Sequence, residues 1–593
     1  MSALGLALLA WAARTNDAPS WLVCVLVLPA VLWAPGLGLA RRLGGGQATG
    51  LQVAIDAAWI STLLAVVSVS ITRALGAAPE LVLGLSALWG LIGAGLGLRV
   101  PWPPHSPRGA WGAVLGVIFA LITLVIWRGE DLRRPLDAYW WSPDAEGLPE
   151  APGVVEPGAG FGEPEVLGWP EQRAMRFFDP DGDGGTLRVG SDGAALLLLR
   201  GPLGARLQVG DADPVEISAD VVEAEEEGAV PRYLRHGVVA ALIPLRPGEL
   251  PVTITGVNGP AELALIPGRD GVWSLHAVGA YRFVHYYQLL NIVENLRWAD
   301  ELWVSRALTV NQPPLWSYPL AVATGLGAPG LMGANALLLG VLLLLGAACA
   351  QLIATYSPDA PAPAWALPAL AAVTVGHLMI EPGSTTFPDP LYAAAMVSGV
   401  AALGTPWRFA AVGVISGALR YPGVVALSVF WAVGAAVGIV GRKPIVALWG
   451  LTGAVGLTIG VFALLTGQLG EWVEILWFET GPEHYHGELS LSALLPRVPE
   501  FYATWLWYTG GGLLCALPLA GRGARLCAIG AGLYSLMLCT IDHHPTHYFL
   551  PLIALSACAV ACNAAALERP ALRWGLPSLA IVGGLWFLSQ GAV

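Results

Sequence analysis

The chain has 593 residues, of which 55% are hydrophobic and only 12% are charged, and its formal net charge at pH 7 is −12. Its mean hydropathy of +0.63 lies far outside the range of water-soluble proteins. This composition excludes a soluble globular protein and predicts an α-helical polytopic membrane protein.

Apolar windows of about 20 residues, the length that crosses a bilayer, recur along most of the chain. They predict about fourteen transmembrane helices, near residues 20–41, 51–73, 78–100, 110–128, 330–352, 363–380, 388–404, 406–419, 423–440, 444–466, 501–520, 524–541, 546–566 and 574–592. The opening MSALGLALLAWAA is short for a span and lacks the basic start and the cleavage site of a signal peptide. It predicts an interfacial or partial helix.

The negative charge belongs to one part of the chain. Residues 129–303 contain 28 of the 42 acidic residues and 13 arginines, a balance of −15, whereas the rest of the chain has a balance of +3. An acidic water-soluble segment argues against binding to nucleic acid or to an anionic lipid surface. The basic residues outside this segment are interpreted as markers of membrane topology.

Short loops that contain Arg or Lys are expected on the cytoplasmic side of the membrane. All the basic loops fall on that side if the segment 311–326 lies along the outer surface and does not cross. The residues concerned are Arg41, Arg42, Arg99, Arg108, Arg408, Arg442, Lys443, Arg522, Arg525, Arg569 and Arg573. The same threading places the acidic segment on the extracytoplasmic side.

The acidic segment has two parts. Residues 142–170 are rich in Pro, Gly and Glu, which predicts an irregular linker. Between 171 and 275, short apolar runs such as ARLQVG and PVTITGV alternate with Gly, Pro and Asp, a pattern typical of a small β-sandwich. We therefore expect an inserted extracytoplasmic β-sandwich.

The sequence DPDGDGG, residues 179–185, has the spacing of a calcium-binding loop at Asp179, Asp181 and Asp183. Position twelve of such a loop would be Gly190 instead of a chelating Glu, so we prefer a hairpin turn and keep a calcium site as the alternative. All seven cysteines lie in apolar segments, so the soluble domain has no disulfide framework and no thiolate zinc site.

The stretch NQPPLW, residues 311–316, marks the return to apolar sequence. Its two prolines favour the start of a helix, where a missing N–H is tolerated, and predict a rigid helix along the outer surface. Trp316 and Tyr318 are expected to anchor this helix at the membrane interface. Asn311 and Gln312 are then candidates for binding a sugar, and an anchoring helix without a ligand is the alternative.

The outward-facing motifs follow one another in a defined order. After a transmembrane helix come DAYWW (137–141), the amphipathic segment YYQLLNIVENLRWADELWVSRALTV (286–310), NQPPL, FPDPLY (387–392), RYPG (420–423) and HYFLP (547–551). Over residues 108–141 and 276–566, this order resembles the GT-C superfamily of membrane glycosyltransferases. Within that superfamily, it is most similar to bacterial relatives of protein O-mannosyltransferases and aminoarabinose transferases.

The resemblance implies a GT-C-like helical core around an inserted sandwich. The implied domains are 1–107, N-terminal transmembrane helices; 108–141, first core helix and acidic loop; 142–275, linker and β-sandwich; 276–327, amphipathic and surface helices; and 328–593, the remaining core. It also implies an inner-membrane enzyme that transfers a sugar from a polyprenyl-phosphate donor to a lipid, glycan or protein acceptor in the periplasm. No glycine-rich phosphate loop for a nucleotide sugar is visible in the cytoplasmic connections.

In that family an acidic residue directly precedes the amphipathic helix, but this chain has FVHYYQ there, with His285 at the acidic position. Asp137 in DAYWW is therefore the first candidate for the base that takes the proton of the acceptor hydroxyl. His285 or Glu294 is the alternative base, and an inactive site is the third interpretation.

Two charged residues of later motifs are further candidates. Asp389 in FPDPLY is expected to hold the acceptor or a divalent cation, and a helix N-terminal carboxylate is the alternative. Arg420 in RYPG is expected to bind the donor phosphate, because a guanidinium pairs well with phosphate oxygens. An arginine that reaches to the membrane interface is the alternative. No other cofactor is assigned.

Two histidine-rich loops complete the candidate site. Candidates for contact with the donor phosphate or sugar are His543, His544, His547 and Tyr548. Candidates for a loop that gates the acceptor are Glu483, His484 and His486. A zinc site is the alternative for the first group, and a plain polar loop for the second.

Two other classes of function stay open. Transporters and flippases tend to have internal repeats and polar groups near the bilayer midplane, and neither a repeat nor a midplane charge pair is evident in the sequence. The other alternative is a catalytically inactive GT-C-like scaffold that binds envelope partners through the sandwich.

Overall fold

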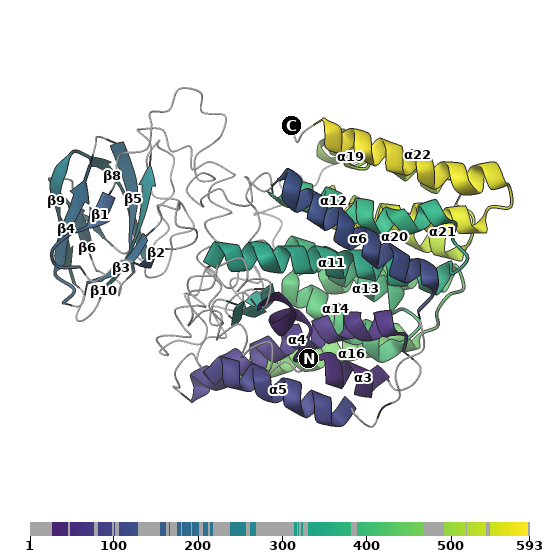
Figure 1. Cartoon of the computed structure of the whole chain (residues 1–593), viewed down its shortest axis with the longest axis horizontal. Coiled ribbons are helices and arrows are strands. Elements are labelled where there is room, and N and C mark those ends of the chain that lie inside the picture. Colours follow the sequence, from purple (N-terminus) through teal and green to yellow (C-terminus); the bar gives the residue numbers. More distant parts are fainter. Residues whose placement is uncertain are drawn as a thin grey trace.

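The structure of the chain is a computed structural model. It describes residues 27–44, 48–75, 81–97, 100, 106–128, 155–161, 165–166, 175–179, 181–190, 193–200, 206–211, 214–216, 238–256, 261–268, 314–316, 318–319, 322–323, 330–380, 388–420, 422–465, 491–517, 519–540 and 546–590. Most of these residues form a bundle of helices, and the strands form a separate sandwich (Figure 1).

The bundle consists of α-helices joined in places by short 3-10 helices. The α-helices are α3 (Leu37–Gly44), α4 (Gly50–Ala74), α5 (Leu81–Gly97), α6 (Arg108–Trp127), α11 (Gly330–Tyr356), α12 (Leu367–Ile380), α13 (Asp389–Ala401), α14 (Pro406–Leu419), α15 (Gly423–Ala436), α16 (Lys443–Leu465), α19 (Leu491–Tyr508), α20 (Arg522–Leu538), α21 (Leu550–Ala566) and α22 (Pro570–Ser589). The 3-10 helices are η1 (Pro314–Trp316), η2 (Ala362–Ala366), η3 (Gly512–Ala516) and η4 (Thr546–Phe549).

Seven helical stretches among the described residues are long and apolar enough to cross a membrane. They are Gly50–Thr72, Arg108–Trp127, Ala336–Tyr356, Ala362–Ile380, Lys443–Val461, Thr546–Ala566 and Pro570–Ser589. Outward-facing side chains of these helices are apolar: Phe119 on α6 is 69% exposed and Leu457 on α16 is 70% exposed. A large exposed apolar surface of this kind is what lipid would cover. The predicted class of helical membrane protein is thus supported, whereas the number of about fourteen spans stays a prediction.

Some helices end earlier than their predicted windows: α13 ends at Ala401 and α15 ends at Ala436, whereas the windows extend to 404 and 440. Others match their windows but are short for a bilayer. α14 has 14 residues, or about 21 Å at 1.5 Å per residue, which is less than the roughly 30 Å of a hydrocarbon core. The predicted window 20–41 is also interrupted, because a turn at residues 33–36 separates its described helical part from α3.

The predicted helix 501–520 is wrong as a continuous element. α19 ends at Tyr508, and the chain passes through Gly510 and Gly511, which have φ angles of 55° and 74°, into η3. Only glycine adopts these angles without strain. The break also lies directly against α22, because a Cβ on Gly510 would collide with the carbonyl of Gly583. Tight packing between two backbones therefore replaces the regular helix.

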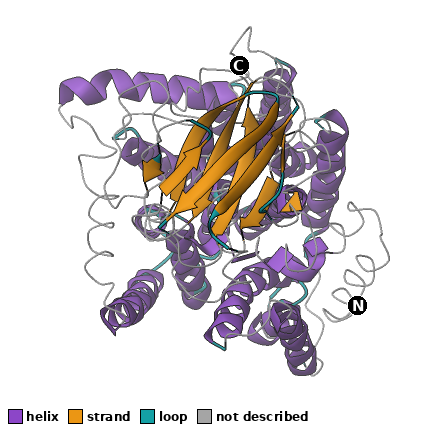
Figure 2. Cartoon of the chain, turned by 90° about the vertical axis from the view of Figure 1, so that its left-hand side faces the viewer, coloured by secondary structure: helices purple, strands orange, loops and turns teal. Residues whose placement is uncertain are grey.

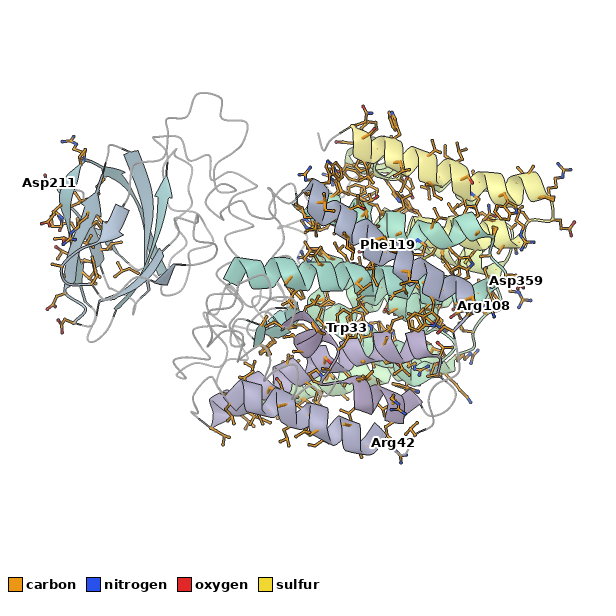
Figure 3. All side chains as sticks on the ribbon, in the orientation of Figure 1. Trp33, Arg42, Arg108, Phe119, Asp211 and Asp359 are labelled. Atoms are coloured by element: carbon orange, nitrogen blue, oxygen red, sulfur yellow. The ribbon has the colours of Figure 1, made fainter. Side chains whose placement is uncertain are left out.

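Two of the basic residues that we interpreted as topology markers lie at the same end of the bundle. Arg42, Arg108 and Asp359 lie at one end, which is on the right in Figure 3, and Arg573 Nη2 donates to the Asp359 carbonyl at 2.6 Å. The sandwich lies beyond the opposite ends of the helices (Figure 1). This arrangement agrees with the predicted grouping of basic loops on one side. Which side faces the cytoplasm stays a prediction.

In the soluble domain, the described residues form a sandwich of ten strands. Its strands are β1 (Val155–Pro157), β2 (Glu165–Val166), β3 (Met175–Asp179), β4 (Gly184–Val189), β5 (Gly193–Arg200), β6 (Arg206–Val209), β7 (Val215–Glu216), β8 (Val238–Leu245), β9 (Gly248–Thr255) and β10 (Ala261–Gly268). The sheet orders are β1-β4-β9-β6-β7 and β2-β3-β10-β5-β8. Figure 2 shows the sandwich in front of the bundle, with its strands side by side.

Strands β3 to β10 have the connectivity of a jelly roll. They pair antiparallel as β3–β10, β4–β9, β5–β8 and β6–β7, so each pair is nested inside the previous one, and alternate pairs belong to opposite sheets. This wrapping of nested pairs defines the eight-stranded jelly roll. β1 and β2 extend the two sheets at the edges of β4 and β3.

The sequence pattern of the strands explains their burial. Leu187 and Val189 of β4 and Val252 and Ile254 of β9 are at most 6% exposed, and the residues between them face outward. This alternation is the two-residue period of a strand with one buried face. The sandwich is present as expected, but it begins earlier, since β1 and β2 lie within residues 142–170, which we expected to form an irregular linker.

The loop at 179–185 is not the hairpin that we expected. It joins β3 to β4, which belong to different sheets and do not pair. Gly182 and Gly184 adopt φ angles of 72° and 106°, and the side chains of Asp181 and Asp183 are exposed. In the part of the chain that the structure describes, no group of three or more His, Cys, Asp or Glu side chains could hold a metal ion.

The described part of the NQPPLW stretch is also different from expectation. Residues 314–316 form η1, which packs against α4 and α14, and Leu315 and Trp316 are 5% and 3% exposed. The prediction that Trp316 anchors a surface helix at the membrane interface is therefore wrong. The Trp316 side chain is instead part of the buried apolar core of the bundle.

Candidate functional site

The candidate site is built around a buried ion pair between Asp389 and Arg420. Arg420 Nε donates to Asp389 Oδ1 at 2.9 Å, and Arg420 Nη2 donates to Asp389 Oδ2 at 2.5 Å. The two side chains are 3% and 12% exposed, respectively. Two parallel charge-assisted hydrogen bonds are the strongest geometry for these groups. The structure thus joins two residues for which the sequence predicted separate roles.

The ends of two helices create this pair. α13 begins at Asp389, and Pro390 is well suited to the first turn of this helix. Proline lacks an N–H group, and an N–H at this position would have no partner within the helix. α14 ends just before Arg420, whose backbone is extended with φ −149° and ψ 127°. The following turn into α15 requires Gly423, since a Cβ there would collide with the backbone of Ser416. This tight turn holds Arg420 beside the start of α13.

The pair lies toward the end of the bundle that faces the sandwich. Trp127, at the opposite end of α6 from Arg108, stacks on His377 with ring centroids 5.0 Å apart. His377 is in the last turn of α12, so α12 leads away from the end that carries Arg108. α13 is the next helix along the chain, and its first residue is Asp389.

Two tyrosines extend the ion pair into a buried polar cluster, which we define as Asp389, Arg420, Tyr392 and Tyr534. The hydroxyl oxygens of Tyr392 on α13 and Tyr534 on α20 are 3.2 Å apart, and both side chains are at most 3% exposed. Both phenols lie within electrostatic range of Asp389 and Arg420. Helices α13, α14 and α20 therefore meet around one polar group of residues inside an apolar core.

The predicted residues His547 and Tyr548 lie on η4. The His547 side chain is 7% exposed, and its ring lies 4.7 Å from that of Tyr548, edge to face. η4 packs against α12, α13 and α21, so it contacts the helix that begins at Asp389. The hydroxyls of Thr546 and Tyr508 are 3.3 Å apart and connect η4 to α19.

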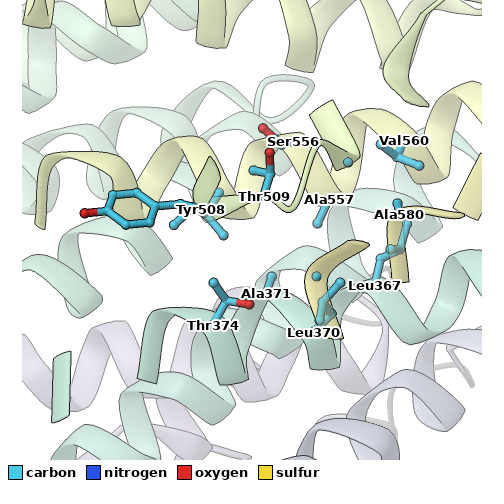
Figure 4. A pocket seen from close by; sticks show the side chains of 13 residues that line it. Leu367, Leu370, Ala371, Thr374, Tyr508, Thr509, Ser556, Ala557, Val560 and Ala580 are labelled. Atoms are coloured by element: carbon cyan, nitrogen blue, oxygen red, sulfur yellow. The ribbon is translucent and has the colours of Figure 1, made fainter. Parts of the chain in front are cut away.

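A cavity lies between α12, α19, η3, α21 and α22 (Figure 4). It contains about 360 Å³ of empty space, including its open part, and Leu367, Leu370, Ile553 and Val560 are among the residues that line it. Ser556 Oγ in its wall donates to the Leu552 carbonyl at 2.7 Å, and Thr509 Oγ1 donates to the Trp505 carbonyl at 3.1 Å. Ser556 Oγ also accepts a hydrogen bond from Trp505 Nε1 of α19 at 3.1 Å, so both hydroxyls are already bonded within the bundle and most of the lining is apolar.

A second buried ion pair joins the N-terminal helices to the core. Arg408 Nε lies 3.1 Å from Asp56 Oδ2, and the side chains are 14% and 10% exposed. Gln52 Nε2 donates to Asp56 Oδ1 at 2.8 Å. Asp56 is inside the membrane-length stretch Gly50–Thr72. The sequence analysis missed this pair, because it treated Arg408 only as a topology marker and found no charge pair within the spans.

Most of the other predicted site residues lie outside the described residues. These are Asp137, His285, Glu294, Asn311, Gln312, Glu483, His484, His486, His543 and His544. Their roles stay predictions. Asp179 lies at the end of β3, and Asp181 and Asp183 are exposed on the far domain, so the weak calcium motif is separate from the polar cluster.

The cluster offers a chemically defined set of groups. A guanidinium can bind two oxygens of a phosphate or carboxylate, and a carboxylate can accept hydrogen bonds from hydroxyl groups. The sequence analysis missed Tyr392 and Tyr534. Tyr392 could have been found from its position three residues after Asp389 on one helix, where the two side chains share a face, whereas Tyr534 carries no local signal.

Comparison of the chain with protein-family models, curated proteins and solved structures gives no match.

Proposed function

We propose that the chain is an integral membrane glycosyltransferase that moves a sugar from a polyprenyl-phosphate donor to an acceptor on the sandwich side of the membrane. The observation that carries this proposal is the largely buried Arg420, held by the buried Asp389 at the helix ends nearest the sandwich. Ionisable groups buried at membrane depth are costly and mark functional sites. The order of the sequence motifs around these two residues supplies the reaction class.

In the proposed reaction, the acceptor hydroxyl oxygen attacks the anomeric carbon of the donor sugar. The bond between that carbon and the phosphate oxygen breaks, and the electron pair leaves with the lipid phosphate. Asp137 is proposed to take the hydroxyl proton. Arg420 is proposed to stabilise the negative charge on the departing phosphate, since a fixed cation in a water-poor site is effective there. A divalent cation at Asp389 stays part of the proposal as an alternative.

The test uses the purified full chain in nanodiscs, with a panel of radiolabelled polyprenyl-phosphate hexoses and pentoses and a cell-envelope fraction as acceptor. We expect release of polyprenyl phosphate and appearance of label in the acceptor. Asp137→Asn should lower the rate by about 100-fold or more, the usual contribution of a general base. Asp211→Asn, an exposed change on the sandwich, is the control and should leave the rate unchanged.

Two outcomes would contradict the proposed activity or the proposed base. If the unaltered chain releases no polyprenyl phosphate from any donor of the panel, the proposal of a glycosyltransferase is wrong. If Asp137→Asn keeps full activity while Glu294→Gln or His285→Gln loses it, the base is one of the alternatives.

A lipid transporter is the second candidate, because Asp56, within a membrane-length stretch, pairs with Arg408, and because the chain breaks between α19 and η3. Broken helices and buried charges within spans are features of transporters. Reconstituted vesicles that contain a fluorescent polyprenyl phosphate in one leaflet test it. Movement to the other leaflet without sugar transfer would favour the transporter.

A further inference from the structure

One edge of the Arg420 guanidinium that can bind a phosphate is already occupied. Its Nε and Nη2 atoms form one edge of the guanidinium, and each donates to a different oxygen of Asp389. The same edge binds two oxygens of a phosphate with the same parallel geometry. A carboxylate and a phosphate therefore compete for this edge, and only one of them can hold it.

Arg420 and Asp389 differ in how exposed their side chains are and in the groups that surround them. The Arg420 side chain is 12% exposed and that of Asp389 is 3% exposed, so Arg420 is the more accessible of the two. Asp389 is in the first turn of α13, where the unpaired backbone N–H groups and the helix dipole stabilise a carboxylate. Asp389 therefore keeps a favourable environment after it leaves Arg420.

The tyrosines provide a second alternative partner. Tyr392 lies on the same helix as Asp389, one turn further on, and its hydroxyl pairs with that of Tyr534. Because Asp389 and Tyr392 are three residues apart on α13, their side chains share one face of the helix. A phenol O–H that turns from its neighbour to the carboxylate would satisfy a displaced Asp389 without water.

We propose that Asp389 is an internal competitor for Arg420: it occupies the guanidinium in the empty protein, is displaced by the phosphate monoester of a polyprenyl lipid, and returns when that lipid leaves. The inference rests on the proposed function for the identity of the lipid. No covalent bond changes in this step. Its consequence is that Asp389 weakens phosphate binding and thereby accelerates release of the product.

The test measures binding without any sugar transfer. The full chain in phosphatidylcholine nanodiscs is titrated with polyprenyl phosphate, with neutral polyprenol of the same length, and with inorganic phosphate. Asp389→Asn removes the competing charge and should bind polyprenyl phosphate about tenfold more tightly than the unaltered chain. Arg420→Gln should bind it at least tenfold more weakly, and polyprenol binding should be unchanged in both variants. If inorganic phosphate shows the same pattern as the lipid, the headgroup alone is recognised.

Asp56→Asn is the matched control. It breaks the other buried pair of an aspartate with an arginine of α14, so it causes similar damage to packing, but it should leave phosphate affinity unchanged. Weaker or unchanged binding by Asp389→Asn would overturn the inference and would show that Asp389 positions Arg420 instead. Equal gains in Asp389→Asn and Asp56→Asn would overturn it as well, since they would reflect a general loosening of the bundle.

A second measurement covers the case in which Asp389→Asn does not fold. Infrared difference spectra of the unaltered chain, taken with polyprenyl phosphate and with polyprenol, should show a shift of one carboxylate band as an aspartate exchanges an arginine for another partner. Absence of any carboxylate change on saturation with the phosphate would overturn the inference. Failure of the proposed sugar transfer would leave these binding results intact, so the two proposals are tested separately.

Discussion

Arg408 and Arg420 stand near the two ends of α14, and each pairs with a buried aspartate from a different helix. Such pairs add little net stability when they form, because both charges lose their water. Breaking one is costly, since the remaining charge is left buried. The two pairs therefore fix the position of α14 between α4 and α13 more than they strengthen the fold.

For these individual side chains, we predict the effect of removing the Asp56 charge on stability. Asp56→Asn leaves the guanidinium of Arg408 without its anion and should lower the free energy of unfolding by about 3 kcal/mol. The double variant Asp56→Asn with Arg408→Gln should recover most of this loss, because no charge then remains buried. Unfolding in mild detergent, followed by the circular dichroism of the helices, measures both.

Glu249→Gln is the control for that experiment. It removes the pair between Glu249 and Arg188, whose atoms are 3.9 Å apart and whose side chains are 68% and 62% exposed. Exposed pairs of this kind contribute little, so the change should stay below about 0.5 kcal/mol. A loss for Asp56→Asn as small as that of Glu249→Gln would contradict the structural role of the buried pair.

Among the secondary-structure elements, glycines set how closely helices approach. α3 and α5 are in backbone contact, since a Cβ on Gly38 would collide with the carbonyl of Gly93. The same kind of contact brings the break after α19 against Gly583 of α22. Small residues at such contacts are the usual basis of helix packing in membranes, where burial of apolar surface contributes little.

We therefore predict that Gly38→Val separates α3 from α5 and lowers the free energy of unfolding by about 1–3 kcal/mol, the range for overpacked sites. Gly84→Val on α5 is the matched control, because no atom lies within 4 Å of a Cβ built there. Both changes replace glycine by valine within a helix and so alter the intrinsic helix propensity by a similar amount, and the difference between them isolates the packing term. Equal stability of the two variants would contradict the close contact.

For the whole molecule, the main consequence is an orientation in the membrane. The sandwich lies at one end of the bundle and Arg42 and Arg108 at the other (Figures 1 and 3). Basic loops stay in the cytoplasm, so the sandwich should face away from it.

Labelling of single cysteines tests this orientation. Asp211 on the sandwich and Arg442 in the loop before α16 are both exposed, and the described native cysteines are all buried. A membrane-impermeant maleimide should label Asp211→Cys in intact spheroplasts and Arg442→Cys only after lysis, with the unaltered chain as the background. Labelling of both from the same side would contradict the predicted topology.

Much of the fold could be predicted from local pattern, but the site could not. Hydropathy located the apolar helices, and the helix N-terminal position that we gave as the alternative for Asp389 is the one it occupies, because both signals act within a few residues. The pair of Asp389 with Arg420 depends on two helix ends that are 31 residues apart in sequence, and the contact of Asp56 with Arg408 joins far more distant segments. The burial of Trp316 and the break after Tyr508 depend likewise on neighbours that no local pattern reveals.

The nested order of the jelly roll has a consequence for how the domain is accommodated. β3 and β10 are antiparallel partners, with Met175 opposite Leu265 and Asp179 opposite Ala261. The first and last strands of the eight-stranded unit are thus neighbours. The chain therefore enters this unit at the start of β3 and leaves it at the end of β10 on the same side of the unit. A domain with adjacent entry and exit points can be inserted between two neighbouring membrane helices without increasing the distance between them.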